Sequence, residues 1–202
     1  MNNFLNELRN PTLYIFQMGK VGSSSLQETL KKNYDGNVVH AHIPQMLSDE
    51  QLKLIKLKKQ FRLPIFIICP IREPIGRNVS AFYQNFERDT GNRFSKSISL
   101  ETQKNLFLKT ARHNVPLDWM DSQLRKFWGV DVYSQNFDKE KLWNVYKKSS
   151  TKVLVYRSDM DRDKQLKIIN EFTGLNIKNW TYKNISSDKV YKDSYREFTN
   201  QI

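Results

Sequence analysis

The chain has very little cysteine and no long apolar run. Cys69 is the only cysteine among 202 residues, so no disulfide can form within the chain. It lies in the apolar run 65–69, where a thiol packs as a small hydrophobic side chain. No apolar stretch approaches the ~18 residues of a membrane span, and the first ten residues lack the apolar core of a signal peptide. We therefore expect a protein without a membrane span, located in the reducing cytoplasm.

Acidic residues are few compared with basic ones. Lys and Arg number 33 and Asp and Glu 21, which gives a formal charge of +12. A field of this sign attracts polyanions such as nucleic acid, anionic membrane, acidic polysaccharide or a nucleotide with several phosphates. No acidic cluster resembles a Mg²⁺ site, and one cysteine cannot build a thiolate site, so we expect no metal. The chain also lacks repeats and low-complexity linkers, and its length suits one domain spanning 1–202.

Apolar runs and helical patterns alternate along the chain. We expect strands at 13–16, 38–43, 63–70 and 152–156, and helices at 26–30, 48–59, 74–83, 100–112, 117–128 and 161–172. The segment 87–99 has the composition of an exposed loop. Strands that alternate with helices predict an α/β fold with a central parallel β-sheet flanked by helices. On the helix 48–59, we expect lysines 53, 56, 58 and 59 to face water.

The segment 13–30 combines a buried strand, a glycine–lysine turn and a hydroxyl-rich helix start. A helix start offers unpaired N–H groups, Gly22 lets the backbone approach an anion, and Lys20 adds a positive charge. The three serines at 23–25 add further donors. The Walker A pattern GxxxxGK[ST] does not fit, because the lysine precedes the serines by three positions. The segment predicts a phosphate site, with a capped helix after a tight turn as the alternative.

A second candidate phosphate site follows the strand 63–70. Arg72 comes at the carboxyl end of this strand, where ligands bind in open α/β sheets. Pro74 suits the first turn of a helix, on which Arg77 and Ser80 share one face. Arg72 with the Ser80 hydroxyl can hold a phosphate. The alternative is a surface ion pair between Arg72 and Glu73.

The two segments together resemble the two nucleotide-binding elements of sulfotransferases that use 3′-phosphoadenylyl sulfate (PAPS). They read K-x-G-S-S-S and R-x-P-x-x-R-x-x-S-x-x-Y. In that family the first element holds the 5′-phosphosulfate and the second the 3′-phosphate. The resemblance covers roughly residues 12–200, is closest to the carbohydrate and bacterial capsular-polysaccharide branch, and implies a P-loop-like single domain. It implies cofactor-binding roles for Lys20, Val21, Gly22, Ser23, Ser24 and Ser25 in the first element, and for Arg72 and Ser80 in the second.

The resemblance also implies a catalytic role for one of two histidines, His40 and His42. We expect the two rings to lie on opposite faces of the strand 38–43, so that one enters a cleft while the other packs as a structural histidine. A similar H-x-H motif occurs in uronyl 2-O-sulfotransferases, whose second histidine is the base. By this resemblance His42 is the predicted base, and His40 a supporting or substitute candidate. Many carbohydrate sulfotransferases use a glutamate instead, for which Glu50 is the fallback here.

Two further sets of residues have open roles. Four aromatic residues can either stack on sugar rings or pack in the core: Trp119, Phe127, Trp128 and Trp143. Packing in the core is the commoner role of helically spaced aromatics. Members of the sulfotransferase family often close a C-terminal loop over the nucleotide. By that resemblance Asn184, Ser186 and Lys189 bind the nucleotide here. The alternative for this tail is an amphipathic terminal helix with solvated lysines.

These observations predict a sulfotransferase that moves a sulfuryl group from PAPS to a hydroxyl of an anionic or neutral oligo- or polysaccharide, leaving the bisphosphate PAP. His42 would deprotonate the hydroxyl and Lys20 would stabilise the leaving oxygen. One alternative is a nucleotide kinase with a variant phosphate loop, although it lacks a Walker lysine and a metal aspartate. The other is a basic nucleic-acid-binding module, although neither a helix-turn-helix nor basic residues interleaved with exposed aromatics are evident. We therefore expect no nucleic-acid partner.

Overall fold

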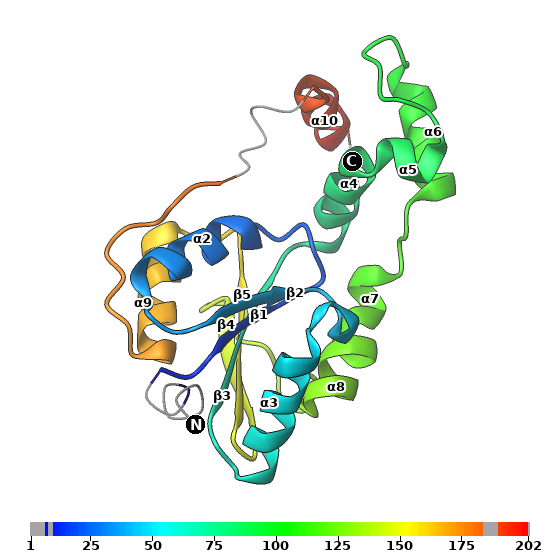
Figure 1. Ribbon diagram of the computed structural model, residues 1–202. Helices are drawn as coiled ribbons and strands as arrows, with labels where there is room; N and C mark the ends of the chain where they lie inside the picture. Colours follow the sequence, from blue (N-terminus) through cyan, green and yellow to red (C-terminus); the bar gives the residue numbers. More distant parts are fainter. Residues whose placement is uncertain (1–6, 8–9, 184–189, 202) are drawn as a thin grey trace.

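The computed structural model describes residue 7, residues 10–183 and residues 190–201. Within these ranges the chain forms a five-stranded sheet with helices on both faces (Figure 1). The strands are β1 (Leu13–Phe16), β2 (Val38–Ala41), β3 (Ile65–Ile71), β4 (Trp143–Lys148) and β5 (Thr151–Arg157), in the order β2-β1-β3-β5-β4. Neighbouring strands are parallel except β4, which pairs antiparallel with β5. The predicted α/β class is confirmed, with an antiparallel edge added to the expected parallel sheet.

Two layers of helices cover the sheet (Figure 1). One face carries α2 (Ser23–Asn33) and α9 (Arg162–Thr173), whose Leu26 and Ile169 pack with Ile15 of β1. The opposite face carries α3 (Asp49–Gln60), α7 (Val115–Trp119) and α8 (Lys126–Trp128), with a π-helical turn, η2 (Met120–Arg125), joining α7 to α8. Trp119 and Trp128 are buried there against Phe16. These two tryptophans therefore occupy core positions, the commoner of the two roles open to them.

A third apolar cluster lies beyond the carboxyl ends of the strands (Figure 1). It joins α4 (Pro74–Gln84), α5 (Phe86–Thr90), α6 (Leu100–Thr110) and the C-terminal α10 (Lys192–Thr199). Phe82 of α4 contacts Phe107 of α6 and Phe198 of α10, with ring centroids 5.5 and 6.5 Å away. The end of the chain is thereby packed beside the helix that follows β3.

The structure differs from the predicted elements in a few places. The strand β4 was not predicted, and the loop 87–99 begins inside α5. The helix over 48–59 is confirmed as α3, with a capping box between Ser48 and Gln51. The prediction that Lys58 faces water is wrong, because Lys58 is only 1% exposed and forms an ion pair with Glu7. Lys58 follows the buried Ile55 by three residues, which places it on the inward face of the helix.

The strand order creates a crevice beside β1. The chain leaves β1 through α2 to β2 on one side, then crosses back through α3 on the opposite face to β3 on the other side of β1. The connections after β1 and β3 thus diverge at the carboxyl ends of adjacent strands. Open α/β sheets bind ligands at such a switch point. No helix in the described ranges is long and apolar enough to cross a membrane.

Candidate functional site

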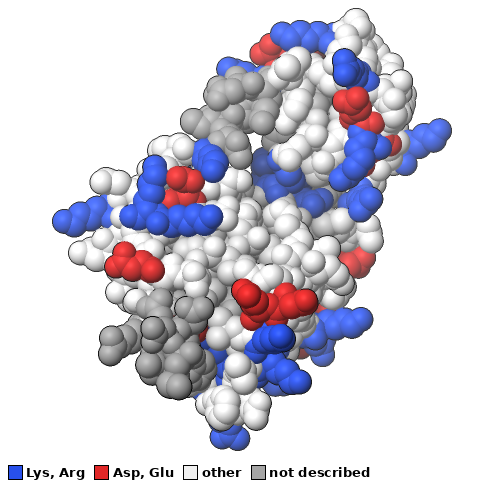
Figure 2. Space-filling view, in the orientation of Figure 1, with Lys and Arg blue, Asp and Glu red and all other residues white. Residues whose placement is uncertain are grey.

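A cavity of about 640 Å³ opens at this switch point. Its walls come from the loop after β1 and the start of α2, the end of β2, the segment around Arg72 with the second half of α4, the start of α9, and the C-terminal segment (residues 181–183 and 190–199). Neither Asp nor Glu is among the described residues that line it, whereas six basic residues are: Lys20, Arg72, Arg162, Lys183, Lys192 and Arg196. Figure 2 shows basic side chains gathered in a hollow of the surface. The cavity therefore favours an anionic ligand with several charges.

The loop between β1 and α2 has the backbone of an anion-binding turn. Gly19, Lys20 and Gly22 adopt left-handed conformations with φ of 83°, 65° and 77°. Gly22 directly precedes α2, and no side chain caps this helix start. Its first N–H groups lack intrahelical partners. Ser23 and Ser24 line the cavity beside them, so this helix start has donors of the kind that can bind an anion.

Arg77, the second arginine of the R-x-P-x-x-R motif, binds this loop on the side away from the cavity. Its Nε donates to the Gly19 carbonyl oxygen at 3.2 Å and its Nη2 to the Met18 carbonyl oxygen at 2.8 Å. Its Nη1 donates to Asn78 Oδ1 at 3.0 Å. The side chain is only 8% exposed, and this burial lowers its pKa. Arg77 does not line the cavity but connects the second motif to the loop of the first.

Arg72 lies over the start of α4. Its Nη2 donates to the Tyr195 hydroxyl at 2.9 Å. A side chain at Gly76 would bring Cβ within 3.3 Å of this Nη2, so a glycine there makes room for the guanidinium. Glu73 accepts the backbone N–H groups of Ile75 and Gly76, both at 2.6 Å, and so caps α4. Glu73 therefore serves as a helix cap instead of the ion-pair partner considered for Arg72.

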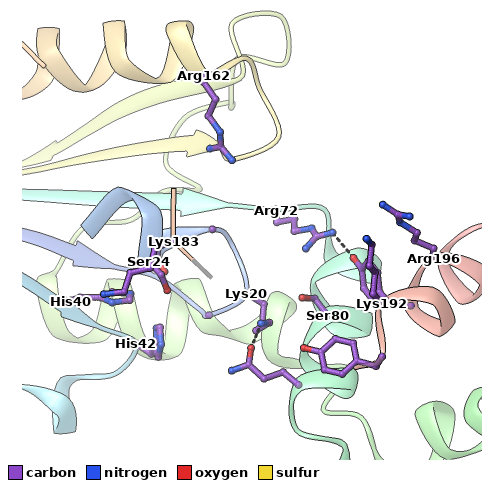
Figure 3. A pocket seen from close by; sticks show the side chains of 16 residues that line it. Lys20, Ser24, His40, His42, Arg72, Ser80, Arg162, Lys183, Lys192 and Arg196 are labelled. Atoms are coloured by element: carbon purple, nitrogen blue, oxygen red, sulfur yellow. Dashed lines mark hydrogen bonds between the residues drawn. The ribbon is translucent and has the colours of Figure 1, made fainter. Parts of the chain in front are cut away.

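Lys20 of the first motif reaches α4, the helix that carries Ser80 of the second motif. Lys20 Nζ donates to the side-chain oxygen of Gln84, which lies one turn after Ser80 on α4. Figure 3 shows the histidine pair at one end of the cavity, Arg72 with Lys192 and Arg196 at the other, and Lys20 between them.

The C-terminal segment contacts both α2, which begins in the first motif, and α4, which lies in the second. The hydroxyl of Thr29 accepts from the Thr181 N–H at 2.9 Å, and that of Ser25 from the Lys183 N–H at 3.0 Å. These hydroxyls are one turn apart on α2 and hold the segment along it, before α10 packs on α4. This segment brings to the cavity five residues that the motif analysis did not assign: Lys183, Tyr191, Lys192, Tyr195 and Arg196.

Two of the predicted binding residues do not line the cavity. Val21 is buried in the core below the loop, and Ser25 holds Lys183 instead of lining the cavity. Arg162 lines the cavity but was not predicted, because it lies at the start of α9, after β5, outside both motifs. Asn184, Ser186 and Lys189 lie outside the described residues.

Both histidines line the cavity. Their ring centroids are 5.1 Å apart and the rings meet edge to face. The prediction of opposite faces is therefore wrong, because residues two apart along a strand point to the same side. Burial, the His42 ring and Lys31 lower the pKa of His40 to about 4. Burial also lowers the pKa of His42, against an opposing hydrogen bond to the Gln17 carbonyl, so both rings are neutral at pH 7 and able to accept a proton.

The other candidates for chemistry are not at the cavity. Glu50, the fallback base, lies exposed in the first turn of α3 and is not among the lining residues. Phe127 and Trp143 pack at the edges of the two core clusters and do not line the cavity either. Across the described part of the chain, no group of three His, Cys, Asp or Glu residues could hold a metal ion.

Comparison with known proteins adds one finding. A family model, NKWYS, described as "Putative capsular polysaccharide synthesis protein", matches residues 90–202, which is more than half of the chain. The chain belongs to the NKWYS family. No curated protein and no solved structure matches it significantly.

The NKWYS match and the two motifs cover different parts of one site. The matched region begins after α4, so it contains neither the loop after β1 nor the segment 72–83. It does contain α9, the C-terminal segment and α10, and with them four of the six basic residues of the cavity. The NKWYS region therefore forms one wall of the cavity and the motif region the other.

Proposed function

We propose that this NKWYS family member transfers a sulfuryl group from PAPS to a hydroxyl of an oligo- or polysaccharide. The observation that carries the proposal is that one basic cavity unites both phosphate motifs and has two neutral histidines at one end. The family's link to capsular polysaccharide supports a glycan as the acceptor. The lining residues fit the donor, because ammonium, guanidinium and helix-start N–H groups are suited to phosphate and sulfate oxygens. A volume of about 640 Å³ lies in the ~300–1,000 Å³ range of ligand pockets.

The two motifs divide the binding of the donor between them. The start of α2, with Ser23 and Ser24, would hold the 5′-phosphosulfate beside Lys20. Arg72 and Ser80 would hold the 3′-phosphate, with Tyr195 orienting the guanidinium through the hydrogen bond it accepts. Arg77 would keep the loop after β1 in its binding conformation. Such preorganised donors stabilise developing charge without further rearrangement.

His42 and Lys20 would carry the transfer. His42 takes the proton of the acceptor hydroxyl, whose oxygen forms the new bond to sulfur. The sulfur–oxygen bond to the 5′-phosphate breaks, and Lys20 stabilises the charge on the departing phosphate oxygen. The products are the sulfated glycan and PAP, with the proton on His42. This reaction needs the base at one end of the donor and the 3′-phosphate site at the other. The proposal is supported by the histidine pair and Arg72 lying at opposite ends of the cavity.

Ligand binding tests the donor site directly. A ligand at ~100 times its Kd stabilises the native state by about 2.7 kcal/mol, which raises Tm by a few degrees in a protein of this size. PAP should give this shift without Mg²⁺, and AMP much less, because it lacks the 3′-phosphate. The variant Arg72→Ala should reduce the PAP shift to that of AMP. Arg93→Ala, which removes an exposed arginine paired with Glu87, is the matched control.

The same measurement separates the alternatives. A kinase should respond best to ATP with Mg²⁺, and a nucleic-acid-binding module to an oligonucleotide but to neither nucleotide. Equal shifts with AMP and PAP would contradict the proposal, because the second phosphate site would be absent. Transfer itself is measured with PAPS carrying radioactive sulfur and an unsulfated capsular polysaccharide as acceptor. Label retained on the polymer is the expected result.

A further inference from the structure

Gln17, the first residue after β1, is fully buried beneath the histidine pair. Its side-chain oxygen accepts the Gly19 N–H, which fixes the orientation of the amide and turns Nε2 toward the histidines. The Nε2 atom lies 2.8 Å from Ser23 Oγ, 2.9 Å from His40 Nε2 and 2.8 Å from His42 Nδ1. Gln17 thus touches both rings and the start of α2 through one nitrogen.

This nitrogen has two hydrogens and three neighbours that can accept. One neighbour must therefore take another role. His42 Nδ1 is the neighbour with another partner at hand, because it also lies 3.1 Å from the backbone oxygen of Gln17 and can donate its own hydrogen there. Ser23 Oγ and His40 Nε2 then accept the two amide hydrogens. His40 Nδ1, 3.2 Å from Gln27 Oε1, completes the network as a donor.

We propose that Gln17 is a positioning residue that holds both histidines as Nδ1–H tautomers, engages Nε2 of His40 and leaves Nε2 of His42 for substrate. Among the described residues, no hydrogen-bond partner occupies Nε2 of His42. In the opposite tautomer this nitrogen would carry a hydrogen and could not accept a proton. The choice of His42 over His40 as base then follows from the network, and only this catalytic consequence rests on the proposed function.

The charges around the pair act in the same direction. Lys20 and Arg77 face His42, and Lys31 of α2 faces His40. Burial first, and these cations in addition, disfavour an imidazolium at either position, so each ring stays neutral and exists as one of two tautomers. Gln17 is a neutral donor, so it can fix the tautomer of the histidines without adding a charge.

Nitrogen-15 NMR of the histidine rings tests the tautomers in the unmodified protein. The chain has only three histidines, so each can be assigned by replacing it with glutamine. We expect hydrogen on Nδ1 of His40 and His42. His113, whose Nε2 lies 3.1 Å from the Phe107 carbonyl oxygen, should carry hydrogen on Nε2 and serves as the reference of opposite type. Hydrogen on Nε2 of His42 would overturn the proposal, whether or not any variant folds.

The variant Gln17→Met keeps the size of the side chain and removes the amide. We expect His40 to become a mixture of tautomers and kcat to fall by about tenfold or more, with KM for PAPS little changed. Gln17→Glu, which accepts but cannot donate, should move hydrogen onto Nε2 of His40 and raise its pKa. The control is Gln45→Met, the same exchange at an exposed position outside the cavity. Unchanged spectra in folded Gln17→Met would reject the role of Gln17.

The two proposals fail separately. The NMR measurement needs neither PAPS nor acceptor, so the predicted tautomers can be found in a protein that transfers no sulfuryl group. That result would keep the network and reject the function. Sulfuryl transfer with His42 protonated on Nε2 would reject the network and keep the function.

Discussion

The two ends of the cavity are built in different ways. The histidine end comes from adjacent strands and is held by neutral hydrogen bonds around the buried Gln17. The opposite end combines α4 with the C-terminal segment, where Arg72 bonds Tyr195, 123 residues further along the chain. Its charged groups include exposed and half-buried side chains. We infer that the first end orients a proton acceptor, whereas the second attracts and holds a charged ligand.

Replacing each histidine by alanine is the strongest test of this division. A well-placed general base contributes about 10²- to 10⁴-fold to rate. We expect His42→Ala to lose activity in this range, and His40→Ala about tenfold, because His40 only supports the network. The measurement is kcat for sulfuryl transfer, with PAP binding as the control for an intact opposite end. Equal rates for both variants and the wild type would mean that another group is the base.

Lys20 links the two ends, and its loss should have the next largest effect. Removing one preorganised charge at a developing oxyanion costs about 10²- to 10³-fold in kcat. Lys20→Ala keeps a Cβ in the same left-handed backbone, so the loop geometry should persist. The exposed Lys53→Ala is the control for general loss of charge. Near-normal turnover of Lys20→Ala would contradict its role as the charge on the leaving oxygen.

The histidine end could be predicted from sequence better than the opposite end. The loop of Lys20 and the paired histidines form short motifs, and the strands next to them were recognised from their apolar runs. Gln17 carried no signal, since its importance depends on three groups that only the fold brings together. Arg77 did carry a motif, but the motif cannot distinguish an arginine that binds a ligand from one that holds a loop.

The C-terminal contribution depends on long-range packing. Tyr195 and Arg196 reach the cavity because apolar residues such as Phe198 pack α10 on α4. A pattern within one short segment contains no information about such a partner. The strand β4 was missed for a related reason, since it has few β-branched residues and is stabilised mainly by pairing with β5. The burial of Lys58 likewise requires Glu7, which lies 51 residues away.

Releasing the C-terminal segment from α2 should weaken donor binding more than turnover. The double variant Ser25→Ala with Thr29→Ala removes the hydroxyls that hold the backbone of Thr181 and Lys183. The two hydrogen bonds together contribute about 2 kcal/mol to holding the segment, and we expect part of this loss to reach the ligand, so that the Kd for PAP rises by roughly tenfold with kcat at saturation little changed. Calorimetric titration measures the change, and Ser97→Ala on the α5–α6 loop is the control. A fall in kcat at saturating donor would show that the two ends are coupled more tightly.

The smallest expected effect concerns stability at mildly acidic pH. The pKa of His40 is lowered from 6.5 to about 4, chiefly by burial, and that of His42 is lowered as well. Between these pH values the unfolded chain binds protons that the folded chain does not, so stability is lost as pH falls from 6.5 toward 4 and is fully present above 6.5. His40→Gln should therefore show a shallower fall of Tm over this window, with a constant difference from the wild type above pH 7. Parallel curves would mean that the His40 ring titrates normally, and the histidine end would then be an open surface instead of a buried network.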